Sequence, residues 1–329
     1  MNIFVSRKIP SLALQELLDS NLKVRLSEFD RPLLPEEFLE RANGSVGLLT
    51  LLTDKVDAEV MDMIGPDLRI ISNYAVGYDN IDVKEATNRG IIVCNTACDE
   101  VDEAVAEHAF SLMVSLARRI VEADEATKRG AYRGWEPDIF LGTSLKGKTI
   151  GIVGLGGIGS KLAQKAKGYG MNVIYNKRTR DTQCEEKMGV TYCSLDELLS
   201  SSDVVSLHVP LSEETRHLID EENLSKMKKG SYLINTARGA VVEEHALVSF
   251  LRQGHLAGAA LDVFENEPII DPELVGMENV ILTPHIASAT VEAREAMGQL
   301  AVNAILKLLN EDKMPENIVN PEVWDKRRK

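Results

Sequence analysis

Three polar residues that each follow an apolar run carry the groups needed to reduce a carbonyl compound. Arg238 follows SYLIN, Glu267 follows GAALDV, and His285 follows VILTP. A guanidinium binds a carboxylate through two hydrogen bonds, and an imidazolium donates a proton to a developing alkoxide near neutral pH. We therefore expect reduction of a 2-oxo acid, in which Arg238 binds the substrate and His285 donates the proton. A buried Glu267, bonded to the other ring nitrogen, would orient the imidazole.

A glycine-rich turn indicates what supplies the reducing equivalents. Gly154-Leu155-Gly156-Gly157-Ile158-Gly159 follows the apolar run TIGIV and opens a segment of helical periodicity. In this setting the glycines permit a tight turn, close approach of the backbone to a pyrophosphate, and close packing of helix on strand. The free amides at the start of the helix then face the phosphates. The motif predicts a dinucleotide-binding site.

The residues after the next strand bear on which dinucleotide is bound. A carboxylate for the adenosine ribose is expected about 20 residues beyond the glycines. Instead, NVIY runs into Asn176-Lys177-Arg178-Thr179-Arg180, and the first acid is Asp181. Cations and a hydroxyl suit a 2'-phosphate. NADP(H) is therefore favoured, whereas NAD(H) stays possible if these residues only form a solvated basic loop.

The apolar runs alternate with segments of helical or turn character, which predicts the fold. Such alternation is typical of parallel sheets covered by helices on both faces. We expect an α/β protein with two doubly wound parallel sheets, whose ligands bind at the carboxyl ends of the strands. The expected strands are NIFVS, KVRLSEF, SVGLLTLL, LRIISNYA and IIVCN in the first domain, and TIGIVG, NVIYN, VVSLHV, SYLINT, GAALDV and VILTP in the second.

Composition narrows the range of partners and locations. The formal net charge of -14 argues against nucleic acid or an anionic membrane surface as a partner. Neither a run of about 20 apolar residues nor a signal peptide is apparent, so we expect a cytoplasmic protein. The four cysteines lack the spacing of a structural metal site and are interpreted as reduced thiols. The C-terminal DKRRK is expected to be a frayed end.

Taken together, these stretches resemble the D-isomer-specific 2-hydroxyacid dehydrogenase family, and within it the glyoxylate and hydroxypyruvate reductases. The resemblance implies a Rossmann cofactor domain, residues 99–286, inserted into a split flavodoxin-like substrate domain, residues 1–98 and 287–329. It also implies a homodimer, and Trp135 lies in the segment expected to form the dimer interface. The alternative is that the Trp135 side chain packs in the core of its own chain. The matching stretches are Gly154 to Gly159, His208-Val209-Pro210-Leu211, Asn235 to Gly239, Leu261 to Pro268 and Thr283 to Ser288.

The resemblance implies site residues beyond those reasoned from chemistry. The amides of Val76 and Gly77, within Asn73-Tyr74-Ala75-Val76-Gly77-Tyr78-Asp79, would hold the substrate carboxylate. The roles of Arg238, Glu267 and His285 agree with those given above. The implied cofactor contacts are Gly154, Leu155, Gly156, Gly157, Ile158, Gly159, Lys177, Arg178, Thr179, Val209, Pro210, Thr236, Ala237, Asp262 and Ala287.

Two features depart from the family pattern and leave the substrate open. The acidic stretch from Thr96 to Glu103 replaces a segment that usually contains proline and fewer acids, and Gly157 stands where a basic residue is common. We expect NAD(P)H-dependent reduction of glyoxylate or hydroxypyruvate. The alternatives are a dehydrogenase for D-lactate or another D-2-hydroxyacid, and a binding protein that senses the dinucleotide, because a fold does not by itself fix a function.

Overall fold

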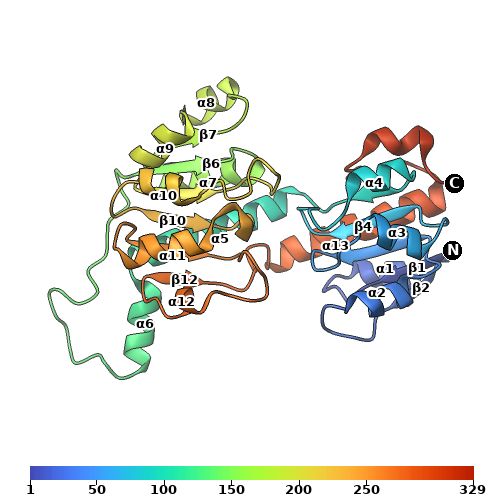
Figure 1. The fold of residues 1–329 in the computed structure, drawn as a ribbon, viewed down its shortest axis with the longest axis horizontal. Helices are drawn as coiled ribbons and strands as arrows, with labels where there is room; N and C mark the ends of the chain where they lie inside the picture. The colour runs from blue at the N-terminus through green and yellow to red at the C-terminus, as the bar shows by residue number, and fades with distance from the viewer. The chain divides into compact units, whose positions relative to one another are not determined.

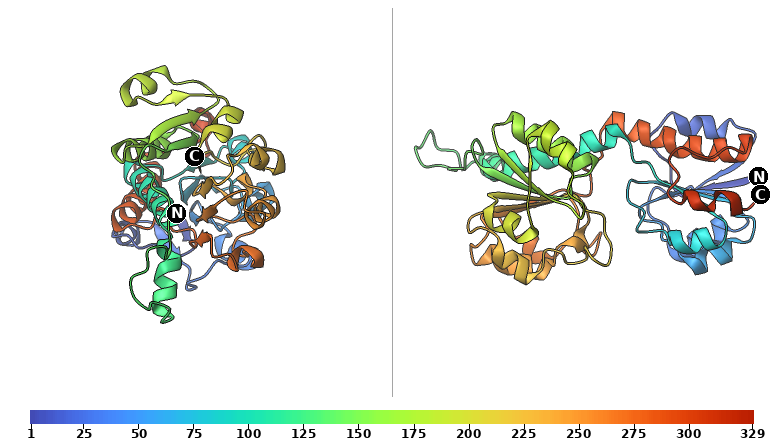
Figure 2. Two further views of the ribbon diagram at one scale, coloured as in Figure 1. Left: turned by 90° about the vertical axis from the view of Figure 1, so that its left-hand side faces the viewer. Right: turned by 90° about the horizontal axis from the view of Figure 1, so that it is seen from above.

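The computed structural model describes all residues from Met1 to Lys329 and divides into two compact units. Unit 1 comprises Met1–Val101 and Ala289–Lys329, and unit 2 comprises Asp102–Ser288. Each unit has one parallel sheet with helices on both faces (Figures 1 and 2). The prediction of two doubly wound parallel sheets is confirmed. None of the helices combines the length and apolarity needed to cross a membrane.

Unit 1 contains a five-stranded sheet in the order β2-β1-β3-β4-β5. Its strands are β1 (Asn2–Val5), β2 (Lys23–Leu26), β3 (Gly47–Leu51), β4 (Ile70–Tyr74) and β5 (Ile92–Cys94). Its helices are α1 (Ala13–Leu18), α2 (Pro35–Ala42), α3 (Ala58–Ile64), α4 (Val83–Asn88), α13 (Val291–Glu311) and the 3-10 helix η2 (Pro321–Lys326). All of β4 is buried, and α13 packs beside it with the Ser72 hydroxyl donating to the carbonyl of Ala301 at 2.8 Å. The chain thus returns to unit 1 through a helix fixed to its central strands.

The C-terminal residues are ordered, so the expectation of a frayed end is wrong. The guanidinium of Arg327 lies 3.7 Å from the centre of the Trp324 ring. Arg328 donates hydrogen bonds to three backbone carbonyls of unit 1, among them that of Arg89 at 2.7 Å. The basic composition of this segment suggested disorder. However, an arginine side chain can donate hydrogen bonds to backbone oxygens from its guanidinium group while its methylene groups pack against the protein.

Unit 2 contains a seven-stranded sheet in the order β12-β11-β10-β9-β6-β7-β8. The chain order reverses between β6 and β9, which is the topological switch point where such sheets bind ligands. The short strand β8 was not predicted, because two residues are too few to show alternation. The strands are β6 (Thr149–Val153), β7 (Asn172–Asn176), β8 (Thr191–Tyr192), β9 (Val204–Leu207), β10 (Tyr232–Asn235), β11 (Gly258–Leu261) and β12 (Val280–Leu282).

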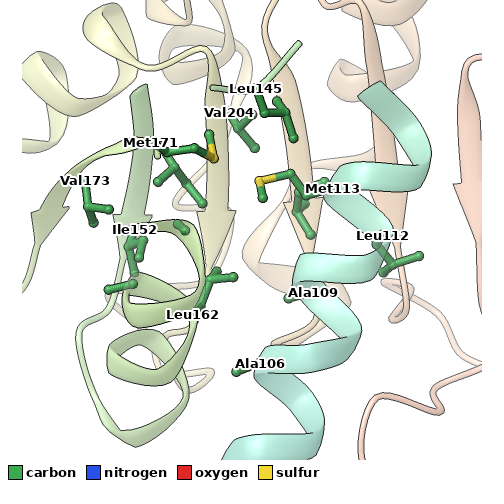
Figure 3. Close-up of a cluster of buried hydrophobic side chains, with 14 of the residues drawn as sticks. Ala106, Ala109, Leu112, Met113, Leu145, Ile152, Leu162, Met171, Val173 and Val204 are labelled. Atoms are coloured by element: carbon green, nitrogen blue, oxygen red, sulfur yellow. The ribbon is translucent and has the colours of Figure 1, made fainter. Parts of the chain in front are cut away.

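Small residues on α5 bring this helix close to the sheet of unit 2. Ala106 and Ala109 face the cluster that contains Ile152 of β6 and Leu162 of α7 (Figure 3). All four side chains are buried, so the glycine-rich turn between β6 and α7 has a rigid support. The helices are α5 (Asp99–Ala117), α6 (Ile120–Lys128), α7 (Gly157–Gly168), α8 (Thr182–Met188), α9 (Leu195–Ser201), α10 (Glu221–Lys226), the 3-10 helix η1 (Gly239–Val241), α11 (Glu244–Arg252) and α12 (Pro272–Val275).

Candidate active site

The glycine-rich turn has the shape of a phosphate cradle. Gly154 has a φ of +98°, and a Cβ there would lie 2.5 Å from a backbone carbonyl oxygen, so no larger residue fits. A Cβ at Gly159 would lie 2.2 Å from the carbonyl oxygen of Gly154, which explains the close packing of helix on strand. In contrast, a Cβ at Gly156 would meet nothing within 4 Å. Open space therefore lies before the first amides of α7, as a bound pyrophosphate requires.

The two departures from the family pattern lie in contact with each other. A Cβ at Gly157 would stand 1.9 Å from Oδ2 of Asp102, which belongs to the acidic stretch. The next acid, Glu103, forms an ion pair with Lys165 of α7 and lies 3.3 Å from the ammonium of Lys161. The last two acids of the stretch, Asp102 and Glu103, are thus held beside α7, and the carboxylate of Asp102 occupies the space that a side chain at position 157 needs.

The side chains of the basic loop after β7 differ in whether they form ion pairs within the protein. Arg180 donates two hydrogen bonds of 2.8 Å to the carboxylate of Glu185. The ammonium of Lys177 lies 3.5 Å from the carboxylate of Asp181. Arg178 and Thr179 are exposed. The charge of Arg178 contributes, after the hydrogen bond of Ser212, to the lowered pKa of the exposed Glu214. Arg178 is therefore the cation of this loop whose charge is most available to a ligand.

Polar atoms without partners lie at the carboxyl ends of the next strands. The Thr236 hydroxyl, after β10, and Nδ1 of His208, after β9, are buried and lack any hydrogen-bond partner. Nε2 of His208 is 2.8 Å from the Ser206 hydroxyl, and burial lowers the pKa of His208 to about 4. Buried polar atoms are rarely left unpaired, and both of these are available to a ligand bound at this edge. Val209, Pro210, Ala237 and Ala287 also follow strands β9, β10 and β12 at this edge.

His285 and Glu267 form the titratable pair that the sequence indicates. Nδ1 of His285 lies 2.8 Å from Oε2 of Glu267, and Oε1 of Glu267 accepts the N–H of Phe264 at 3.0 Å. Burial acts to raise the pKa of Glu267, but the hydrogen bond and the charge of His285 outweigh it and hold this pKa below its usual value. The Glu267 side chain is 31% exposed, so the expectation of a buried carboxylate is wrong. Since Nδ1 is occupied, Nε2 of His285 is the nitrogen left for a substrate.

A buried carboxylate holds the backbone that carries His285. Asp262 is fully buried; it accepts the Thr283 hydroxyl at 2.6 Å and the amides of Ile286 and Ala287 at 2.9 and 2.8 Å. His285 itself has a φ of 54°, in the left-handed region that non-glycine residues seldom adopt. Strain of this kind persists only where the surroundings fix it, and it is common at functional sites. Asp262 supplies that support.

His108 of α5, which was not predicted from the sequence, joins this support. Its Nε2 lies 3.1 Å from the Thr283 hydroxyl and 3.4 Å from Oδ1 of Asp262. Burial acts to raise the pKa of Asp262, but the hydrogen bonds from His108, Thr283 and two amides keep it below its usual value. Only helical spacing could have revealed His108, because it lies within the amphipathic pattern of α5 and has no local motif.

Arg238 lies in the same unit and acts electrostatically on Glu267. Its Nη1 donates to the carbonyl of Ala237 at 2.8 Å, and Asn235 donates Nδ2 to the carbonyl of Arg238 at 2.9 Å. The positive charge of Arg238 contributes to the lowered pKa of Glu267. Arg238, Glu267 and His285 thus all follow parallel strands of one sheet and share its carboxyl edge.

The two remaining sequence-based site features lie elsewhere in the chain. Val76 and Gly77 follow β4 in unit 1 and are partly exposed. Trp135 is 83% exposed, so its alternative assignment to the core is wrong. It lies in the long loop after α6, which extends away from the seven-stranded sheet together with that helix (Figure 1). Tyr132 and Leu141 of this loop are also exposed, by 62% and 66%.

A family model and a curated relative match this chain over much of its length. The family model "D-isomer specific 2-hydroxyacid dehydrogenase, NAD binding domain" matches residues 110–287, more than half of the chain. A glyoxylate reductase of Thermococcus litoralis is 46% identical over 325 residues, which cover 98% of this chain and 97% of the relative.

Two solved structures share the whole fold. An NADPH-dependent glyoxylate/hydroxypyruvate reductase from Sinorhizobium meliloti, in complex with NADP and malonate, has a TM-score of 0.85 at 32% identity and covers 100% of this chain and 98% of that one. A D-lactate dehydrogenase from Aquifex aeolicus, with NAD and lactic acid, has a TM-score of 0.84 at 31% identity and covers 97% and 99%. The chain therefore belongs to the D-isomer-specific 2-hydroxyacid dehydrogenase family and is an NAD(P)-dependent oxidoreductase.

Proposed function

We propose that this enzyme reduces glyoxylate or hydroxypyruvate to the corresponding 2-hydroxy acid. The His285–Glu267 pair, 2.8 Å apart at the carboxyl edge of a dinucleotide-binding sheet, is the observation that carries the proposal. Glyoxylate reductases that match this chain over nearly their full length support this choice of substrate. Reduction of an aldehyde or ketone needs a hydride and a proton. His285 is suited to donate the proton, and the glycine-rich turn is suited to hold a dinucleotide that would supply the hydride.

In this proposal each polar residue has one task. A bound nicotinamide dinucleotide supplies the hydride for the carbonyl carbon. His285 donates the proton to the carbonyl oxygen from Nε2, and Glu267 holds the ring and stabilises its charged form. Arg238 binds the substrate carboxylate and the neighbouring oxygen, and the amides of Val76 and Gly77 complete the carboxylate site. Groups fixed in this way lower the barrier chiefly through positioning.

We propose NADP(H) as the preferred cofactor, with NAD(H) as the possible substitute. The exposed Arg178 and the Thr179 hydroxyl would bind the 2'-phosphate, and Lys177 would add its charge if it leaves Asp181. The glycine cradle and the unpaired Thr236 hydroxyl support dinucleotide binding in this unit. The proposed contacts are Gly154, Leu155, Gly156, Gly157, Ile158, Gly159, Lys177, Arg178, Thr179, Val209, Pro210, Thr236, Ala237, Asp262 and Ala287.

We further propose that unit 1 is the substrate domain and unit 2 the cofactor domain, in a cytoplasmic homodimer. The exposed loop after α6 supports the dimer, because Trp135, Tyr132 and Leu141 expose large side chains that an interface would cover. Sedimentation equilibrium tests this part: a dimer is expected for the native chain, and a monomer at every concentration would contradict it. Trp135→Ala, with Tyr169→Ala outside the loop as control, tests the interface.

Two alternatives stay open. The likeness to a D-lactate dehydrogenase supports pyruvate as the substrate. A dinucleotide-sensing binding protein is the alternative from another class, since the fold alone does not require turnover. The test is oxidation of NADPH and of NADH by the purified protein with glyoxylate, hydroxypyruvate and pyruvate. We expect the highest kcat/KM for glyoxylate or hydroxypyruvate with NADPH; preference for pyruvate would favour the D-lactate alternative, and binding without turnover would favour the sensor.

A further inference from the structure

Three consecutive carbonyl groups after β4 are all bound from within unit 1. They belong to residues 75–77. Thr96 donates its backbone N–H to the first at 2.9 Å, Asn95 donates Nδ2 to the second at 2.7 Å, and Asn73 donates Nδ2 to the third at 3.1 Å. The donors come from β4 itself and from the segment after β5, the parallel neighbour of β4. Each peptide group of the loop therefore has one side fixed to the domain.

The opposite side of these peptides presents their N–H groups. In a trans peptide the carbonyl and the following N–H point in opposite directions, and the only cis peptide of the chain is Glu267–Pro268. The N–H groups of Val76, Gly77 and Tyr78 thus point away from the three donors. None of them has an acceptor in the structure. Successive amides turned to one side form a concavity that binds anions.

The two asparagines that hold this loop are themselves anchored, Asn73 through its side chain and Asn95 through its backbone. Asn73 is fully buried; its Oδ1 accepts the Thr50 hydroxyl at 3.0 Å, and its Nδ2 also donates to Oδ1 of Asn80 at 3.1 Å. Asn95 is held by the C-terminal segment, since its N–H donates to the carbonyl of Asn317 at 3.2 Å and the Asn317 side chain donates back to the Asn95 carbonyl. Rotation of the Asn73 side chain would break several hydrogen bonds, and the Asn95 side chain starts from a backbone that is bound on both sides.

We infer that Asn95 and Asn73 are positioning residues for substrate, which hold the carbonyls of residues 75–77 so that three amides, including that of Tyr78, face the substrate carboxylate. The inference rests on the proposed function, in which the amides of Val76 and Gly77 bind that carboxylate. Neither asparagine touches the substrate. Their effect is preorganisation: an amide site that is already ordered loses less conformational entropy when the anion binds. Through Asn317, the C-terminal segment takes part in this ordering.

Asn95→Asp is the variant that isolates this effect. It keeps the size of the side chain but replaces the Nδ2 donor with an oxygen, which repels the Val76 carbonyl at the present distance of 2.7 Å. Asn88→Asp is the matched control: it makes the same chemical change at an exposed position of α4, where the side chain donates a hydrogen bond to Glu85. The readouts are KM and kcat for glyoxylate, the inhibition constant of oxamate, and the Kd of NADPH.

We expect Asn95→Asp to raise both the KM for glyoxylate and the inhibition constant of oxamate about tenfold. The Kd of NADPH should stay within about twofold, because the cofactor contacts belong to unit 2, and Asn88→Asp should match the wild type. An unchanged oxamate constant, or an equal loss of NADPH affinity, would overturn the inference. If Asn95→Asp does not fold, Asn95→Ala removes the same donor and is expected to act in the same direction.

A separate measurement distinguishes failure of this inference from failure of the proposed function. If the wild type turns over none of the 2-oxo acids, amide NMR of the deuterated full-length chain is recorded during titration with oxamate. Shifts of the Val76, Gly77 and Tyr78 amides in the wild type, reduced in Asn95→Asp and retained in Asn88→Asp, would support the positioning role without reference to turnover. The absence of shifts at these amides in the wild type would overturn it.

Discussion

Replacing Arg178 by glutamine should weaken NADPH binding and leave NADH binding unchanged. The Arg178 guanidinium is exposed and forms no ion pair. Its interaction within the protein is electrostatic, with the exposed Glu214, so little in the folded protein is lost when it is removed. A hydrogen bond between charged groups contributes about 1.5–3 kcal/mol. Because solvent screens an exposed site, the lower end of this range applies, about 1.5–2 kcal/mol. The expected increase in the Kd of NADPH is therefore about 10- to 30-fold.

Arg180→Gln is the control for this experiment. Its guanidinium lies two positions along the same loop, but Nε and Nη2 are already bound to Glu185. The variant removes the same charge from the loop and should change the Kd of NADPH by no more than about threefold. Fluorescence titrations with NADPH and NADH give the ratio of the two dissociation constants. An equal loss of affinity for both cofactors in Arg178→Gln, or an equal effect of Arg180→Gln, would refute the assignment of Arg178 to the 2'-phosphate.

Three further perturbations probe the proton donor, the cradle and the edge of the sheet. Glu267→Gln keeps a hydrogen-bonding group beside His285 but removes the charge that stabilises the imidazolium. In steady-state kinetics, kcat should fall about 10- to 100-fold, and titration should show little change in NADPH affinity. An unchanged kcat would exclude a catalytic role of the His285–Glu267 pair. Gly159→Ala places a Cβ 2.2 Å from a carbonyl oxygen and should lower the free energy of unfolding by at least about 1 kcal/mol. In the same helix, a Cβ at position 168 meets nothing within 4 Å, so Gly168→Ala should raise the free energy of unfolding by up to about 1 kcal/mol. Urea unfolding that ranks the two variants in the opposite order would be inconsistent with this packing. The pKa of His208 is lowered from 6.5 to about 4 in the folded protein, so the unfolded chain binds the proton more tightly. The wild type should therefore lose up to about 3 kcal/mol of stability as pH falls from about 6.5 to 4. His208→Gln should lack this part of the decline, and equal declines in both proteins would be evidence against a neutral, buried imidazole.

The strands and the catalytic edge could be predicted from local patterns. Apolar runs separated by helical segments allow few arrangements other than parallel sheets, and the carboxyl ends of parallel strands meet at one edge. Residues directly after such runs, such as Arg238 and His285, therefore share an edge whatever the details of packing. The strand β8 escaped because its two residues carry no periodicity.

The partners of individual charges could not be predicted, because they depend on tertiary contacts. The sequence groups Arg178 with Arg180, yet only Arg180 is hydrogen-bonded to a carboxylate, that of Glu185 on the helix that follows. The link between His108 and Asp262 joins residues far apart in the chain and has no motif. The contact of Asp102 with Gly157 likewise needs the fold, although both had been singled out as unusual. Order at the C-terminus was missed for the same reason.

The most direct test of the central claim is the rate of NADPH oxidation when glyoxylate or hydroxypyruvate is added to the wild type and to His285→Ala in parallel. We expect rapid oxidation by the wild type and a kcat lower by about 100- to 10,000-fold in the variant, with the Kd of NADPH unchanged. Equal rates in the two proteins would contradict the role of His285 as proton donor, and no oxidation by the wild type with either substrate would contradict the proposed reaction.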